Sequence, residues 1–286
     1  MSPISFTVVI AHGSCHTPAP YQPLIDALQK QGIEAYCPQR PTCDLSRLNV
    51  GDIHQPDFNR PPPVGGYPTA ADDAAELGEV LDRLIGEGKS VLLVAHSSGG
   101  WVAAEAATAA RQAPKRIATG QSGGIIGIFF VGAFLIPAGE SVSGFFQPPD
   151  GSFVVPPFMQ FYEHGGNGLG TMKDPAHFLF PDVDSAMAQK WADTLTAAPI
   201  MDSPLTHDPY PDLPCAYVVL DEDRTLPKEY QEGMIAAQRA KDSIDFIVYH
   251  APSGHSPHIS WTGGLVGKIE EFVGQIQEIG MASDGT

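Results

Sequence analysis

Three residues that could together perform acyl transfer lie far apart in the sequence, at Ser97, Asp223 and His255. A serine hydroxyl is a weak nucleophile until a histidine removes its proton, and that histidine needs a carboxylate to fix its tautomer and stabilise the imidazolium. Each of the three follows an apolar run that is typical of a buried strand. Because open α/β sheets place their ligand sites at the carboxyl ends of the strands, we expect the three side chains to converge.

Ser97 lies in the segment VLLVAHSSGGW, where an apolar run ends in a serine flanked by small residues. Ala95 precedes it by two positions and Gly99 follows it by two, which gives A-x-S-x-G, a variant of G-x-S-x-G. An alanine-rich segment follows, so the pattern predicts a strand, a sharp turn and a helix in direct succession. Choosing Ser98 as the nucleophile would put His96 where a small residue is needed. We therefore assign Ser97 as the nucleophile and the Ser98 N–H as one oxyanion donor.

The acid and the base each have one alternative. Asp221 and Asp223 both follow a predicted strand, and we favour Asp223 because it is set back in the turn, with Asp221 as the fallback. His255 follows Gly254 and precedes the final predicted helix, whereas His258 lies further on and could face the pocket or simply pack. The favoured set keeps the chain order of serine, acid and histidine.

The loop after the first predicted strand, HGSCH, is expected to line the same pocket. Its backbone N–H at Ser14 is the expected second oxyanion donor, because the loop lies beside the serine turn at the same sheet edge. His12 is expected to be structural, and Cys15 and His16 to line the entrance or to pack beneath it. A metal site at His12 and His16 lacks a carboxylate ligand, so none is predicted.

Length and charge limit the class of protein. The chain has 286 residues and a formal net charge of −17, with Lys+Arg 16 against Asp+Glu 33. This length suits one large α/β domain that buries a core around a pocket and carries an inserted subdomain. The negative charge would repel phosphate backbones and anionic membranes, so neither nucleic acid nor a membrane is an expected partner.

Cysteine usage and the N-terminus point to the cytosol. The four cysteines, Cys15, Cys37, Cys43 and Cys215, show no C-x-x-C pair and no zinc spacing, which suits a reducing compartment. The N-terminus lacks the basic region of a signal peptide, and no run approaches the ~18 apolar residues of a membrane span. We expect a cytoplasmic enzyme that needs neither a metal nor another cofactor. The sequence leaves its oligomeric state open.

Predicted strands and helices alternate along most of the chain, which favours an α/β fold with a mostly parallel sheet and helices on both faces. We expect the strands at residues 7–11, 33–37, 91–94, 125–133, 216–220 and 245–249. We expect the helices at residues 20–31, 69–87, 101–110, 227–240 and 263–279, with a polar connection at residues 113–124.

The alternation is interrupted between residues 137 and 214. This divides the chain into a first core part at residues 1–136, a cap or lid insertion at 137–214 and a second core part at 215–286. The insertion shows no clear strand, and its one clear helix is predicted at residues 185–196. Residues 38–68 are rich in Pro, Gly, Asn and Asp and predict a long loop, which in compact domains is often functional or mobile.

Many aromatic side chains gather in the insertion, and such residues on loops need apolar surface to cover. We interpret the segment as a cap over the site, the alternative being a subsidiary core beneath loops. The side chains expected to contact a substrate are His16, Phe146, Phe158, Phe180 and His258.

A resemblance to a known family lies in four segments: HGSCH at 12–16, VLLVAHSSGGW at 91–101, AYVVLDEDRTLPKEYQ at 216–231 and SGHSPHIS at 253–260. They resemble the α/β-hydrolase superfamily, and more narrowly its branch of plant methyl esterases and hydroxynitrile lyases with fungal relatives. The resemblance covers nearly the whole chain except residues 43–66 and much of the cap. It implies a Ser97, Asp223 and His255 triad with an oxyanion hole at the Ser14 and Ser98 N–H groups.

Two departures from that branch matter for the chemistry. Ala95 replaces the usual first glycine of the motif, which is tolerable because a methyl group is the smallest addition. Gly13 stands where the lyases carry a threonine, and Ser256 stands where they carry a lysine. Cyanohydrin cleavage is therefore disfavoured.

The sequence favours a cofactor-independent serine hydrolase that cleaves a small, largely apolar carboxylic ester or lactone through an acyl-enzyme. One alternative keeps the fold and triad for carbon–carbon cleavage, elimination or cyclisation, since this fold hosts many chemistries. Another is a ligand receptor derived from a hydrolase.

Overall fold

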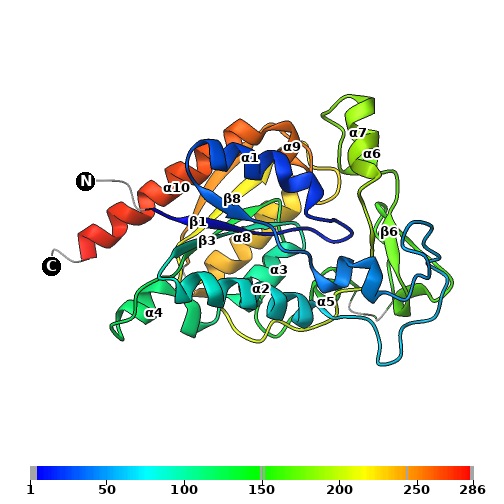
Figure 1. The fold of residues 1–286 in the computed structure, drawn as a ribbon, viewed down its shortest axis with the longest axis horizontal. Helices are drawn as coiled ribbons and strands as arrows, with labels where there is room; N and C mark the ends of the chain where they lie inside the picture. Colours follow the sequence, from blue (N-terminus) through cyan, green and yellow to red (C-terminus); the bar gives the residue numbers. More distant parts are fainter. Residues whose placement is uncertain (1–4, 149, 151, 243, 284–286) are drawn as a thin grey trace.

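The computed structural model describes residues 5–148, 150, 152–242 and 244–283. Its centre is a six-stranded sheet in the order β2-β1-β3-β4-β8-β9, and every neighbouring pair of these strands is parallel (Figure 1). In that order the strands span Glu34–Tyr36, Thr7–Ala11, Ser90–His96, Gly124–Val131, Cys215–Leu220 and Phe246–Ala251. All six lie where the apolar runs predict them, within a few residues.

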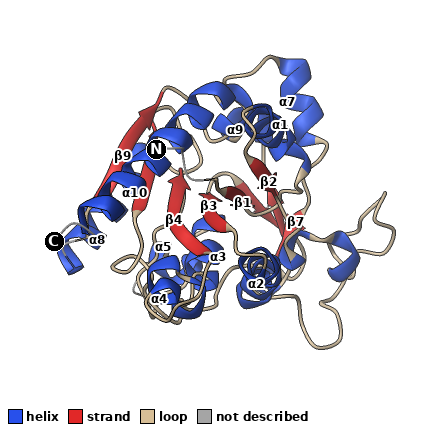
Figure 2. Cartoon of the chain, turned by 60° about the vertical axis from the view of Figure 1, so that its left-hand side comes forward, coloured by secondary structure: helices blue, strands red, loops and turns tan. Residues whose placement is uncertain are grey.

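Helices cover both faces of the sheet, and α1 and α2 lie on opposite sides of it (Figures 1 and 2). One face packs against α1 (Gln22–Lys30) and α10 (Thr262–Ser283), and the other against α2 (Ala70–Gly86), α3 (Gly99–Ala106) and α8 (Lys228–Asp242). Along β1, Val8 and Ile10 enter one core while Val9 and Ala11 enter the other. Burial on both faces explains why these strands appear as continuous apolar runs. The predicted α/β fold class is confirmed. Within the described residues, no helix is long and apolar enough to cross a bilayer.

Local sequence signals set several helix boundaries. At the start of α2, Thr69 accepts a hydrogen bond from the N–H of Asp72, and the Asp72 carboxylate accepts one from the N–H of Thr69. The chain leaves α1 through Gly32, whose φ of 78° favours glycine. The predicted connection at residues 113–124 was partly wrong, because it contains the short helix α4 (Ala113–Ile117), which carries a proline in its first turn.

Between β4 and β8 the chain leaves the main sheet and forms a small antiparallel sheet in the order β5-β6-β7. This segment between β4 and β8 contains, in chain order, α5 (Val142–Phe146), β5 (Met159–Phe161), β6 (Gly170–Met172), α6 (Pro175–Phe178), α7 (Ser185–Ala192) and β7 (Ala197–Ala198). The prediction that this segment holds no strand was wrong, because two- and three-residue strands are too short to show a period. The helix predicted at residues 185–196 is α7, and it ends four residues earlier.

The long loop at residues 38–68 packs against this inserted segment. Leu48 and Val50 are buried in one cluster with Leu169 and Ala197. The loop therefore packs against the inserted segment through this buried cluster.

Candidate active site

The turn between β3 and α3 holds Ser97 at a φ of 54°, in the left-handed region that a non-glycine residue rarely adopts. A Cβ at Gly99 would collide with the carbonyl oxygen of Ala11, and a Cβ at Gly100 would collide with that of Phe134. Only glycine fits these two positions, because the helix begins in contact with the neighbouring backbone. A strained turn of this kind, which costs about 1–3 kcal/mol, places its serine at the apex of the turn, at the carboxyl edge of the sheet.

His255 and Asp223 form a buried pair on the loops that follow β9 and β8. The His255 Nδ1 lies 2.7 Å from the Asp223 Oδ2, and both side chains are almost fully buried. The other carboxylate oxygen, Oδ1, accepts hydrogen bonds of 2.8 Å from the N–H groups of Thr225 and Leu226. The orientation of the carboxylate is therefore fixed, and His255 donates its Nδ1–H to it. This tautomer leaves the His255 Nε2 free to accept a proton.

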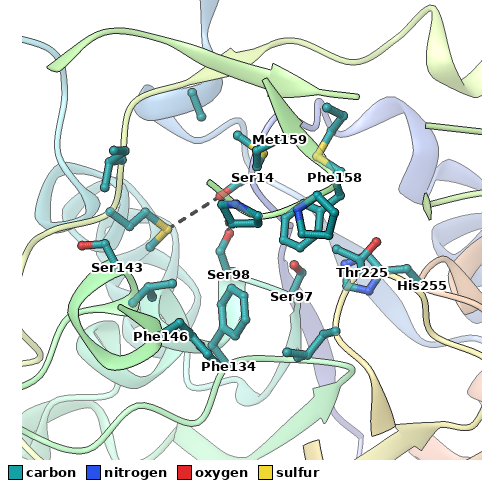
Figure 3. Close-up of a pocket in the computed structure, with 18 of the residues that line it drawn as sticks. Ser14, Ser97, Ser98, Phe134, Ser143, Phe146, Phe158, Met159, Thr225 and His255 are labelled. Carbon is teal, nitrogen blue, oxygen red and sulfur yellow. Dashed lines mark hydrogen bonds between the residues drawn. The ribbon is translucent and has the colours of Figure 1, made fainter. Parts of the chain in front are cut away.

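Ser97 and His255 line the same cavity (Figure 3). No hydrogen bond joins the two side chains among the residues that the structure describes, and such contacts often tighten only when substrate binds. Asp221, the fallback acid, is exposed and lies 3.0 Å from the Nδ1 of His250. Of the two acids, Asp223 is the one that reaches the histidine.

The N–H groups of Ser14 and Ser98 donate to no acceptor in the described part of the chain. Both residues line the cavity beside Ser97, one from the loop after β1 and the other at the start of α3 (Figure 3). Their side-chain oxygens lie 2.8 Å apart. Two unused backbone donors thus flank the serine, in an arrangement able to stabilise a negatively charged oxygen.

The cavity has a volume of about 420 Å³, and its wall is mainly apolar. Its apolar lining includes Phe134, Val142, Phe146, Phe153, Val154, Phe158, Met159, Phe161, Met172, Leu179, Ile200, Met201, Leu226 and Tyr230. Most of these side chains come from the segment between β4 and β8. Among the described lining residues, the exposed Arg224 is the only one that is an arginine, lysine, aspartate or glutamate.

A model of the alpha/beta hydrolase family matches residues 8–266 of the chain. The protein belongs to the alpha/beta hydrolase family. The resemblance inferred from the four sequence segments is thereby confirmed.

Proteins similar to this alpha/beta hydrolase include one that is similar in sequence and two that are similar in structure. An alpha/beta hydrolase from Aspergillus novofumigatus, nvfD, is 24% identical over 274 residues, which are 95% of this chain and 98% of the relative. A pyrethroid hydrolase from Sphingobium faniae has a similar structure, with a TM-score of 0.68 at 16% identity over 94% of this chain and 97% of the other. A methylesterase from Arabidopsis has a TM-score of 0.59 at 18% identity over 94% and 99%.

In this alpha/beta hydrolase, two residues expected at the substrate do not line the cavity. Phe180 is buried with Leu179, Ala188 and Trp191, because the turn after α6 directs it into the core of the inserted segment. His258 lies in α9 (Pro257–Ser260) and stacks on Tyr21, with ring centroids 4.2 Å apart. Both therefore contribute to packing.

His16, Phe146 and Phe158 do line the cavity. The Nδ1 of His16 lies 2.8 Å from the carbonyl oxygen of Ser14, so it carries the proton. Burial, the largest cause, lowers the pKa of His16 to about 4, and the imidazole is neutral near pH 7. His12 is also buried and uncharged, and its Nε2 accepts a hydrogen bond from the N–H of Arg40.

A chain of buried hydrogen bonds that the sequence did not predict connects two loops of the site. The N–H of Gly13 donates to the Tyr21 hydroxyl at 3.0 Å, and that hydroxyl donates to the His96 Nδ1 at 2.6 Å. The His96 Nε2 then donates to the carbonyl oxygen of His255 at 2.7 Å. Since the carbonyl can only accept, the tautomer of His96 is determined. These hydrogen bonds fix the position of the His255 loop relative to the loop that carries Ser14.

Proposed function

We propose that this alpha/beta hydrolase is a serine esterase that cleaves a largely apolar carboxylic ester or lactone through an acyl-Ser97 intermediate. The observation that carries the proposal is the 2.7 Å pair of His255 and Asp223, since His255 and the elbow serine Ser97 line one apolar cavity. The named activities of the pyrethroid hydrolase and the methylesterase support hydrolytic and ester chemistry.

In the proposed reaction, the Ser97 oxygen attacks the ester carbonyl while its proton passes to the His255 Nε2. Asp223 stabilises the imidazolium. The carbonyl oxygen becomes an oxyanion that accepts hydrogen bonds from the N–H groups of Ser14 and Ser98. The bond to the alcohol breaks, and His255 returns the proton to the departing alkoxide. Water, deprotonated by His255, then cleaves the acyl-Ser97 bond and regenerates the serine.

We further propose that residues 137–214 act as a cap that encloses the apolar part of the substrate. The support is the origin of the cavity wall, since Phe146, Phe158 and most of the other apolar lining side chains belong to this segment. His16 would border the reacting end of the substrate, because it lies on the same loop as Ser14.

A fluorophosphonate reagent tests the nucleophile and the reaction class together. We expect stoichiometric labelling at Ser97, located by peptide mass spectrometry, and a pre-steady-state burst of alcohol from an aryl ester. Labelling at Ser98 would move the nucleophile by one residue. No labelling and no burst would contradict the esterase and favour a chemistry without an acyl-enzyme.

The cavity predicts a preference for long acyl chains. Burying one methylene contributes about 0.8 kcal/mol, so kcat/KM should rise roughly fourfold per added methylene until the cavity is full. Phe146→Ala and Phe158→Ala should reduce this dependence, because each removes part of the apolar wall. A series of aryl esters of increasing acyl length measures it.

Phe180→Ala is the matched control for these two variants. Phe180 is a fully buried aromatic outside the cavity, so its removal should lower the free energy of unfolding by about 3–5 kcal/mol and leave the chain-length dependence unchanged. If Phe146→Ala and Phe158→Ala also change only stability, the inserted segment does not recognise the acyl chain.

A further inference from the structure

A buried ion pair lies directly behind the two candidate oxyanion donors. Arg40 is 3% exposed and Asp73 is 1% exposed. The Arg40 Nη2 and Nε lie 2.8 and 2.9 Å from the Asp73 Oδ2, and Thr42 donates its N–H and hydroxyl to the same carboxylate. Burying such a pair has a desolvation cost of several kcal/mol per ion, and an apolar pair is often as stable. Stability alone therefore gives little reason for charges at this position.

The remaining nitrogen of Arg40 joins the two segments that carry the donors. Its Nη1 donates to the carbonyl oxygen of His12 at 2.7 Å and to the Ser98 Oγ at 2.8 Å. His12 begins the loop that presents the Ser14 N–H, and Ser98 presents the other N–H. The planar guanidinium thus holds the loop after β1 and the elbow in one fixed relation.

The direction of the hydrogen bonds beyond Arg40 follows from the donor inventory. Arg40 can only donate, and the Met201 sulfur can only accept. The Ser14 Oγ lies 3.7 Å from the Met201 sulfur, a contact drawn in Figure 3 in which the sulfur is the acceptor. The Ser14 Oγ and the Ser98 Oγ lie 2.8 Å apart, and donation from Ser98 to Ser14 is the arrangement that gives both hydroxyl protons an acceptor. Arg40, Ser98, Ser14 and Met201 thus form one run of hydrogen bonds that begins at the guanidinium.

Arg40 remains cationic in this environment. Burial by itself lowers its pKa, but the Asp73 carboxylate and other neighbours more than offset this, and the net shift is upward. The charge also acts on the cavity wall: after the dominant effect of burial, Arg40 is among the groups that lower the pKa of His16. A fixed positive charge therefore stands behind the place where the oxyanion would develop.

We propose that Arg40, held by Asp73, is a positioning residue that fixes the Ser14 and Ser98 donors and adds its positive charge behind the oxyanion. It acts through the carbonyl of His12 and the hydroxyl of Ser98 and does not touch the substrate. This inference rests on the proposed esterase function. A purely structural ion pair would affect the amount of folded enzyme but not the rate of each active site.

The test compares variants by kcat per active site, counted with the fluorophosphonate reagent. Arg40→Met combined with Asp73→Asn removes both charges, so that no unpaired ion stays buried. We expect kcat to fall about 10²-fold, as for the loss of an oxyanion donor, with KM within about threefold. Affinity for a trifluoromethyl ketone, whose adduct carries an oxyanion, should fall by a similar factor. Arg40→Lys keeps the charge but not the fork, and should recover part of the loss.

Ser98→Ala tests the chain without disturbing the ion pair. It keeps the peptide N–H and removes only the hydroxyl, and we expect kcat to fall about tenfold. The same change should have almost no effect in the Arg40→Met/Asp73→Asn background, because the hydroxyl is then no longer oriented.

Arg111→Met/Asp82→Asn is the matched control. It removes a bidentate pair of 2.7 and 2.8 Å between residues that do not line the cavity, and should leave kcat unchanged.

Several results would overturn the inference. One is a folded Arg40→Met/Asp73→Asn variant with wild-type kcat per titrated site, or with unchanged affinity for the ketone. If that variant does not fold, a Ser98→Ala variant with the kcat of the wild type would overturn the inference instead. Wild-type protein that is not labelled at Ser97 would overturn the esterase proposal as well, whereas a labelled, active wild type with unaffected variants overturns this inference alone.

Discussion

Ser97→Ala is expected to lower kcat for an ester substrate by about 10⁵- to 10⁶-fold, because no other hydroxyl occupies the elbow apex. Folding should be almost unchanged. Alanine carries the same Cβ into the left-handed backbone at φ 54°, and the Ser97 hydroxyl makes no hydrogen bond within the described residues. Steady-state kinetics measures the first effect, and thermal unfolding should give a midpoint within about 3 °C of the wild type.

Ser98→Ala is the natural control, since it changes the neighbouring serine and keeps the backbone donor. Its expected loss of about tenfold is far smaller than the loss at Ser97. The comparison also tests the assignment of the elbow. If Ser98→Ala abolishes labelling and turnover while Ser97→Ala does not, the nucleophile has been assigned one residue too early.

Asp223→Asn is expected to reduce kcat by about 10⁴-fold through the wrong histidine tautomer. The N–H groups of Thr225 and Leu226 bind Oδ1, so an asparagine would keep its carbonyl oxygen there. Its amide nitrogen would then face the His255 Nδ1, which could only accept. The proton of His255 would move to Nε2, where it prevents removal of the proton of Ser97.

Asp221→Asn separates this effect from a general loss of negative charge on the same loop. The Asp221 carboxylate is exposed, and among the described residues its one hydrogen-bond partner is His250. A surface pair of this kind contributes little, so kcat should stay within about threefold of the wild type. The two variants are compared by kcat at pH 7 with one ester. A crippled Asp221→Asn beside an active Asp223→Asn would show that the acid was assigned wrongly.

Much of the core fold could be predicted because its signals are local. Buried parallel strands need continuous apolar runs, so the runs of apolar residues were enough to predict β1, β3, β4, β8 and β9. The elbow was visible for a different local reason, since a strained serine packed against β1 requires small residues around it. Strands that are parallel in one sheet end at one edge, and this brought Ser97, Asp223 and His255 together in the prediction.

The inserted segment could not be predicted in the same way. Its strands have two or three residues and are held by pairing with each other and by packing on the loop at residues 38–68. A short strand has no period, and its stability comes from contacts that are distant in the sequence. The composition of the segment indicated only that its aromatic residues needed an apolar surface.

The sequence by itself determined the elements of the core, the order in which it presents serine, acid and histidine, and the family to which it belongs. Only the tertiary structure decided which aromatic residues face the cavity, since Phe158 and Phe180 are chemically identical and differ only in their neighbours. It also decided that Arg40 meets Asp73 behind the serines. Whether a charged residue can be buried depends on the partners that surround it in space, and the spacing of residues along the chain does not reveal those partners.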